Sequence, residues 1–131
     1  MTGLLLGTTF GAVAGCASGI ASYRGILQNR QILIPRNEAV ALTRPNGVML
    51  VSAPNLNDSI IVRNVPEHGL VALSALCTHR GCEVRAMPGS LQCPCHGSEY
   101  DSYGEVIEGP AQNSLRRYTI SENAESYVLK L

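Results

Sequence analysis

The residues best suited to chemistry lie in two short segments in the second half of the chain. Residues 77–82 read Cys-Thr-His-Arg-Gly-Cys, and residues 93–100 read Cys-Pro-Cys-His-Gly-Ser-Glu-Tyr. Together they hold four of the five cysteines and two of the three histidines, with ten residues between the segments. Thiolates and imidazoles suit zinc, copper or iron–sulfur, and argue against magnesium or calcium. The pattern predicts a metal centre.

Six candidate ligands are two more than a four-ligand site needs. The surplus, one cysteine from each segment, could close a disulfide that clamps the two segments together. Two thiolates and two imidazoles then remain, and this is the ligand set of a Rieske [2Fe–2S] centre. A structural zinc site with two cysteines and two histidines is the alternative. Zinc, however, gives no role to the extra cysteines or to the Gly-Ser-Glu-Tyr end of the second segment.

The two segments resemble the cluster motifs of Rieske proteins from cytochrome bc-type quinol-oxidising complexes, over roughly residues 71–115. The resemblance implies that Cys77 and Cys93 hold the inner iron and that His79 and His96 hold the outer iron. Replacing two cysteines by neutral histidines raises the reduction potential of such a cluster. A histidine ligand also has a second ring nitrogen that can titrate, and in the resembled family this nitrogen meets quinol.

The resemblance further implies a disulfide between Cys82 and Cys95. Dioxygenase-type Rieske domains usually lack this pair, so its presence favours the electron-transport branch. Ser98 and Tyr100 match the family's hydrogen-bond donors to a bridging sulfide and to a cysteine sulfur. Such donors stabilise the reduced cluster and raise its potential. The alternatives are a turn hydroxyl for Ser98 and a packed aromatic ring for Tyr100.

Other positions in this region have more local interpretations. Gly97 and Gly81 are expected to serve the backbone, at positions where a Cβ would crowd the cluster. Pro110 matches the family's proline loop, which covers the cluster from a third side, although Gly-Pro is also a generic turn signal. His68 lies in neither motif and reads as a turn or surface residue. Arg80 stands where the branch commonly has an apolar residue, and a cation there could suit an acidic partner.

The chain of 131 residues has zero formal net charge, which gives no electrostatic footprint for nucleic acid. Its first charged residue is Arg24. Residues 1–24 are therefore predicted to be a membrane anchor or, alternatively, a lipoprotein signal in which Cys16 is acylated. Residues 25–131 are predicted to form one Rieske [2Fe–2S] domain, with its cluster-binding part at about 75–112.

After a tether at 23–31, the pattern turns short and strand-like, with turn residues at regular spacing. It predicts an all-β, Rieske-like antiparallel β-sandwich with the metal loops at one end. We expect strands at residues 31–34, 39–42, 48–51, 60–65, 70–76, 115–120 and 127–131.

The leading functional interpretation is a membrane-tethered electron carrier that passes electrons from quinol to a cytochrome. By the resemblance its partners are a quinone-binding cytochrome b-like subunit and a c-type cytochrome. The domain would lie on the periplasmic or another extracytoplasmic side, where a disulfide survives. The alternative is the small Rieske subunit of a molybdenum oxidoreductase of the arsenite-oxidase type. In either case the chain is an oxidoreductase subunit and not a complete enzyme alone.

Overall fold

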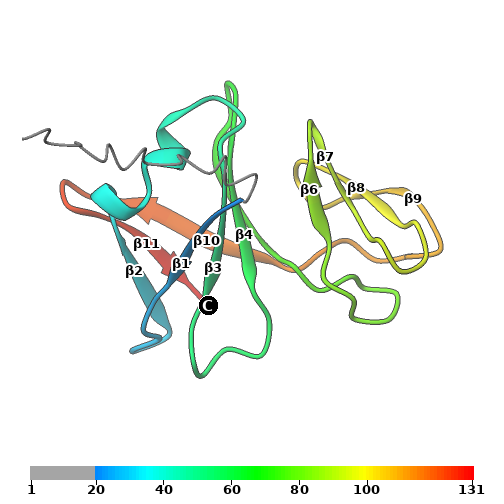
Figure 1. The fold of residues 1–131 in the computed structure, drawn as a ribbon, viewed down its shortest axis with the longest axis horizontal. Coiled ribbons are helices and arrows are strands. Elements are labelled where there is room, and N and C mark those ends of the chain that lie inside the picture. Colours follow the sequence, from blue (N-terminus) through cyan, green and yellow to red (C-terminus); the bar gives the residue numbers. More distant parts are fainter. Residues whose placement is uncertain (1–19) are drawn as a thin grey trace, which may run out of the picture.

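The structure is a computed structural model that describes residues 20–131, and these residues form two β-sheets (Figure 1). In spatial order, the larger sheet consists of β1 (Ala21–Arg24), β3 (Val48–Ser52), β4 (Ile60–Val65), β5 (Gly69–Ser74), β10 (Arg117–Glu122), β11 (Ser126–Lys130) and β2 (Gln31–Pro35). The smaller sheet consists of β6 (Arg85–Met87), β7 (Ser90–Gln92), β8 (Glu99–Asp101) and β9 (Val106–Glu108). All neighbours pair antiparallel except β1 and β3, so the predicted all-β class is confirmed.

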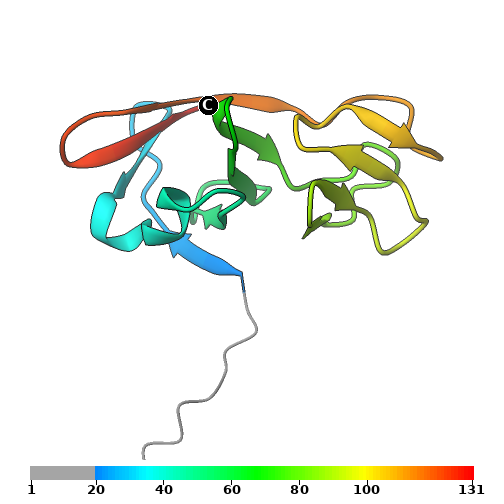
Figure 2. The ribbon, with the colours of Figure 1, turned by 90° about the horizontal axis from the view of Figure 1, so that it is seen from above.

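The smaller sheet is an insertion between two neighbouring strands of the larger one. Strands β5 and β10 pair directly, with Leu73 opposite Arg117 and Ala72 opposite Tyr118. All of β6–β9 lies between them in sequence, at one end of the molecule. Figure 2 shows the chain turning back after β9 and passing through a loop, residues 109–116, into β10. The insertion is therefore fixed at its two ends to adjacent strands, which limits how far it can move.

Strand β4 contributes to both hydrophobic cores, which explains why it begins with three consecutive apolar residues. Ile60 and Val62 pack in a core within the larger sheet, together with Ile32 and Leu129. Ile61 points to the opposite face and packs in a second core that includes residues of the smaller sheet. Alternate side chains of a strand face opposite ways, so a strand buried on both faces loses the usual apolar–polar alternation. The second core is the one on which the cysteine loops rest.

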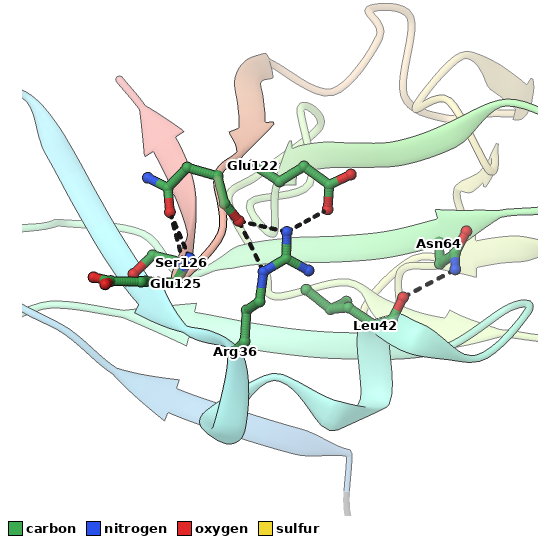
Figure 3. Close-up of polar contacts among 7 residues, drawn as sticks. Arg36, Leu42, Asn64, Glu122, Glu125 and Ser126 are labelled. Atoms are coloured by element: carbon green, nitrogen blue, oxygen red, sulfur yellow. Dashed lines mark hydrogen bonds and ion pairs between the residues drawn. The ribbon is translucent and has the colours of Figure 1, made fainter.

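The strand predicted at residues 39–42 is wrong. Residues 40–42 lie in the short 3₁₀ helix η2 (Val40–Thr43), which follows a second one, η1 (Arg36–Glu38), after the single residue Ala39. Side chains hold them in place: Arg36 donates to the carbonyl of Asn123 and pairs with Glu122 at 3.1 Å, while the Asn64 amide donates to the carbonyl of Leu42 at 2.9 Å (Figure 3). These contacts come from distant parts of the chain, so local apolar spacing could not reveal them.

The beginning of the predicted tether is part of the larger sheet. Residues 21–24 form β1, paired with β3, and the main chains of Gln28 and Gln31 pair in a tight turn. The predicted anchor or signal at 1–24 falls mostly outside the described residues, and the alternative role of Cys16 lies outside them too. Within residues 20–131, no helix has the length and apolar character needed to cross a membrane.

Arg63 joins the two sheets and is the buried charged residue of the described chain, at 4% exposure. From β4 its guanidinium donates to the carbonyls of Met87 (2.8 Å) and Ser90 (3.2 Å), which flank the β6–β7 turn. No carboxylate in residues 20–131 pairs with it, and its Nε is buried without a partner. Burial lowers the pKa of Arg63, but the group remains a cation because arginine stays protonated at any ordinary pH. The bonds to carbonyls therefore have to offset the desolvation.

Replacing Arg63 with methionine is expected to reduce the free energy of unfolding by about 2 kcal/mol, because hydrogen bonds from a charged donor contribute about 1.5–3 kcal/mol. Urea unfolding monitored by circular dichroism measures this. The matched control is Arg44→Met, at an exposed arginine between η2 and β3, which should change stability by less than about 0.5 kcal/mol. Equal effects of the two changes would contradict the joining role of Arg63.

Candidate metal centre

The two cysteine-containing segments form loops with the same main-chain closure. In the first loop, between β5 and β6, the Cys77 amide donates to the carbonyl of Cys82 and the Gly81 amide donates to that of Cys77. In the second loop, between β7 and β8, the Cys93 amide donates to Ser98 and the Gly97 amide to Cys93. The distances are 2.7–3.0 Å. Each loop therefore turns its first cysteine inward in the same way.

Gly81 and Gly97 are explained by their backbone, with φ of 76° and 80°. Side chains rarely adopt this left-handed region, whereas glycine does so without steric cost. A Cβ at either position would meet no protein atom within 4 Å. Backbone conformation is therefore the requirement that the structure shows, and the expectation that a Cβ would crowd the cluster stays a prediction.

A disulfide between Cys82 and Cys95 joins the two loops, so this predicted pairing is confirmed. The Sγ atoms of Cys82, Cys93 and Cys95 all lie within 4.8 Å of one another. That trio cannot act as a three-thiolate metal site, since two of its sulfurs are bonded to each other. Only Cys93 among the three remains a thiolate donor.

The cysteines without a disulfide among the described residues, Cys77 and Cys93, are buried at 3% and 1% exposure. Burial raises the pKa of the Cys77 thiol, but hydrogen bonds from Tyr100, the His79 amide, Cys93 and Ser98 more than offset it, and the net pKa is lowered. A buried thiol whose surroundings favour the thiolate is suited to binding a metal ion.

The two motif histidines face each other beside these thiols. The ring centroids of His79 and His96 are 4.9 Å apart with the planes at 85°. His96 is exposed and His79 is half-buried. The Nδ1 atom of His79 is buried and has no hydrogen-bond partner in residues 20–131. A buried polar nitrogen without a partner is costly, and an imidazole nitrogen in this position commonly binds a metal.

Tyr100 lies where a donor to cysteine sulfur was predicted. It is completely buried, and its hydroxyl is 3.3 Å from the Cys77 Sγ. The same hydroxyl accepts a bond from the Thr78 amide at 3.1 Å and contacts the Thr78 hydroxyl at 3.0 Å. Burial, and then the bond to Cys77, raise the pKa of Tyr100, so the phenol keeps its proton at neutral pH. Tyr100 can thus donate a proton toward the sulfur.

Ser98 is also completely buried, and its Oγ accepts a hydrogen bond from the Ala111 amide at 2.9 Å. The bond ties the second loop to the segment that contains Pro110, and it leaves the hydroxyl proton of Ser98 free to be donated elsewhere. Pro110 and His79 line the same open cleft of about 420 Å³, with Thr78, Gln112 and Asn113. The proline loop therefore lies beside the first cysteine loop, and its predicted role as a cover for the cluster stays a prediction.

The donor set fits a [2Fe–2S] cluster of the Rieske type. It offers two buried thiols, two imidazoles in edge-to-face contact, and one imidazole nitrogen that is buried without a partner in residues 20–131. Two sulfur and two nitrogen donors match the ligands of such a cluster.

One contributor was missed by the sequence analysis. Thr78 donates from its amide to the Tyr100 hydroxyl at 3.1 Å and from its hydroxyl to the Asn113 carbonyl at 2.5 Å, which links the first loop to the proline loop. Its place directly after Cys77 was the available signal, but the residue type alone does not indicate these contacts. His68 lies in the β4–β5 turn and is exposed, as predicted.

Comparisons with known proteins agree with this description. The Rieske [2Fe-2S] domain family matches residues 35–119. The cytochrome b6-f complex iron-sulfur subunit of Prochlorococcus marinus (strain MIT 9301) is 50% identical over 73 residues, or 54% of this chain and 41% of that protein. The same subunit of Synechococcus sp. (strain CC9605) is 43% identical over 72 residues, or 53% of this chain and 40% of that protein. The chain matches about two fifths of the length of these curated relatives.

Among solved structures, the cyanobacterial plasma membrane Rieske protein PetC3 from Synechocystis PCC 6803 is 30% identical with a TM-score of 0.59, over 65% of this chain and 87% of that one. A chain of a hyperthermophilic respiratory complex III is 27% identical with a TM-score of 0.54, over 64% and 66%. Naphthalene 1,2-dioxygenase, 16% identical over 80% of this chain and 26% of its own with a TM-score of 0.64, shares the fold. Since the family match covers more than half of its length, the chain belongs to the Rieske [2Fe-2S] domain family.

Proposed function

We propose that this chain is the electron-transfer subunit of a cytochrome bc-type complex and binds one [2Fe–2S] cluster. Cys77 and Cys93 hold the inner iron, and His79 and His96 hold the outer iron. The observation that carries the proposal is that two loops joined by one disulfide each contribute one buried free thiol and one imidazole, and that the two imidazole rings are in contact. The similarity to cytochrome b6-f iron-sulfur subunits supports the same assignment.

When bound, the cluster accepts and releases one electron. The chain's own residues supply the proton chemistry. With Nδ1 of His79 buried, the Nε2 atom of that ring is the one left to face a substrate in the cleft shared with Pro110. A quinol hydroxyl would pass its proton to this nitrogen as the electron leaves, because an unprotonated imidazole nitrogen accepts a hydrogen bond. Ser98 and Tyr100 stay buried, and their hydrogen bonds raise the reduction potential of the cluster.

The partners of this proposal are a quinone-binding cytochrome b-like subunit and a c-type cytochrome. The cleft beside His79 is polar, since its other lining residues are mainly Thr78, Gln112 and Asn113. A quinone site would therefore have to come from a partner subunit. The disulfide supports a location on an oxidising, extracytoplasmic side of the membrane.

The test is a low-temperature EPR spectrum of the dithionite-reduced protein, with its iron, zinc and acid-labile sulfide content. We expect two irons and two sulfides per chain with a Rieske-type signal. A colourless protein that contains one zinc and gives no signal would overturn the proposal and leave a structural zinc domain.

Replacing Ser98 with alanine is expected to lower the midpoint potential and leave the cluster assembled, because a donor that stabilises the reduced state is lost. Protein-film voltammetry measures the shift. The matched control is Ser102→Ala, since the Ser102 hydroxyl donates to the Gly89 carbonyl in the smaller sheet, away from both loops. An unchanged potential in Ser98→Ala would rule out the tuning role.

A further inference from the structure

In the segment that leads into the first cysteine loop, residues 74–77, every backbone amide donates a hydrogen bond. The amides of Ser74, Ala75 and Cys77 donate to main-chain carbonyls at 2.7–2.8 Å. The Leu76 amide differs, because it donates to a side chain, the Oγ of Ser74, at 3.2 Å. Nearly all buried backbone donors in folded proteins are paired. The Ser74 hydroxyl therefore completes the pairing of the backbone amides immediately before Cys77.

The Ser74 hydroxyl makes a second hydrogen bond, to a carboxylate. It donates to Oδ2 of Asp58, a residue of the β3–β4 loop, and the Tyr118 hydroxyl donates to the same oxygen at 3.3 Å. Ser74 and Tyr118 are 5% and 9% exposed. A chain of hydrogen bonds thus runs from the Asp58 carboxylate through Ser74 to the Leu76 amide. A carboxylate acceptor makes the bond from Ser74 stronger and fixes the direction of its hydroxyl.

This chain of bonds has two arms with different ends. The Ser74 arm continues to the main chain next to Cys77, whereas the Tyr118 arm ends on β10 of the larger sheet. Arg116 lies over the Tyr118 ring at 5.2 Å, and no ion pair joins Asp58 to an arginine in residues 20–131. The two arms use the same carboxylate oxygen, so they can be separated by substitution.

We propose that Asp58 is a positioning residue for the metal centre, acting through Ser74 to hold the Leu76 amide and thereby Cys77. This rests on the proposed function only in taking Cys77 as a ligand. Nothing in the sequence around Asp58 indicates such a role, because it lies 19 positions before Cys77 in an Asn- and Asp-containing turn.

The test compares Asp58→Asn, Ser74→Ala and Tyr118→Phe in the full chain. Cluster loss is followed by visible absorbance, and hydrogen exchange of peptides spanning 74–84 by mass spectrometry. We expect about tenfold faster cluster loss and faster exchange in Asp58→Asn and Ser74→Ala, because the Leu76 amide or the buried Ser74 hydroxyl loses its partner. Tyr118→Phe should lower the melting temperature and leave both rates near those of the unmodified protein.

Asn123→Ala serves as the control for a lost loop acceptor, since Asn123 Oδ1 binds the amides of Glu125 and Ser126 in the distant β10–β11 turn. Equal cluster-loss rates in Tyr118→Phe and Ser74→Ala would reduce Asp58 to a general stabilising residue, and unchanged rates in Asp58→Asn would overturn the proposal. The iron and sulfide content of the unmodified protein tests the proposed function separately. If iron is absent, exchange of the 74–84 peptides still decides whether Asp58 positions the loop.

Discussion

Replacing His96 with alanine is expected to give a protein that retains less than about a tenth of its iron and no Rieske-type EPR signal, because an iron with one protein ligand is not held. His96 is exposed and makes no hydrogen bond to a protein side chain in the described residues, so the substitution should leave the β-sheets intact. Iron analysis, EPR and far-UV circular dichroism on the same sample give the three readings.

The matched control is His68→Ala. His68 is likewise an exposed histidine in a loop, and its ring stacks edge-on with Tyr103 at 5.4 Å, away from both cysteine loops. This variant should keep its iron and its EPR signal, with at most a small loss of stability. If His96→Ala keeps two irons and an unchanged spectrum, the assignment of His96 as a ligand is wrong.

The metal centre was predictable because its residue types are rare in this chain and their spacing is short. Ligands, disulfide and the Ser98–Tyr100 pair all fall in two motifs, and a motif fixes relative positions without knowledge of the fold. The structure confirms the disulfide of Cys82 and Cys95, and it brings Tyr100 to Cys77 as predicted. Ligation of iron and the tuning role of Ser98 stay predictions.

The larger sheet was also mostly predictable, whereas the smaller one was not. Strand β4 lies where predicted, at Ile60–Val65, because six consecutive residues reveal a pattern. Strands β6–β9 have three residues each, and three positions are too few for a period of two to stand out. Their place is determined by contacts across the molecule, such as the bonds from Arg63 to the β6–β7 turn.

The residues that position the metal centre were also not predictable from the sequence. Thr78, Ser74 and Asp58 are ordinary turn or strand residues by type, and each gains its role from a partner 16 or more positions away. Sequence motifs therefore reveal the atoms that touch the metal, while the hydrogen bonds that orient those atoms become visible only in three dimensions.

Removing the disulfide by the double substitution Cys82→Ser and Cys95→Ser is expected to lower the free energy of unfolding by about 3 kcal/mol, the usual effect for a loop of about 15 residues. The bond spans 13 positions and is the covalent link between the two ligand loops. Cluster half-life, measured by visible absorbance in the presence of a chelator, should fall by at least about tenfold, since 1.4 kcal/mol already corresponds to a factor of ten.

The double variant is preferable to either single one. In Cys82→Ser the freed Cys95 thiol would lie within 4.8 Å of the Cys93 sulfur, where it could replace a ligand or oxidise with it. Cys95 is exposed, so reducing the unmodified protein with a thiol reagent should reproduce the short half-life without any substitution. A double variant with unchanged unfolding and half-life would show that the paired main-chain closures hold the loops alone. Each main-chain closure, however, joins residues of the same loop. Without the disulfide, no covalent bond in the described residues would hold the two loops at a fixed distance from each other.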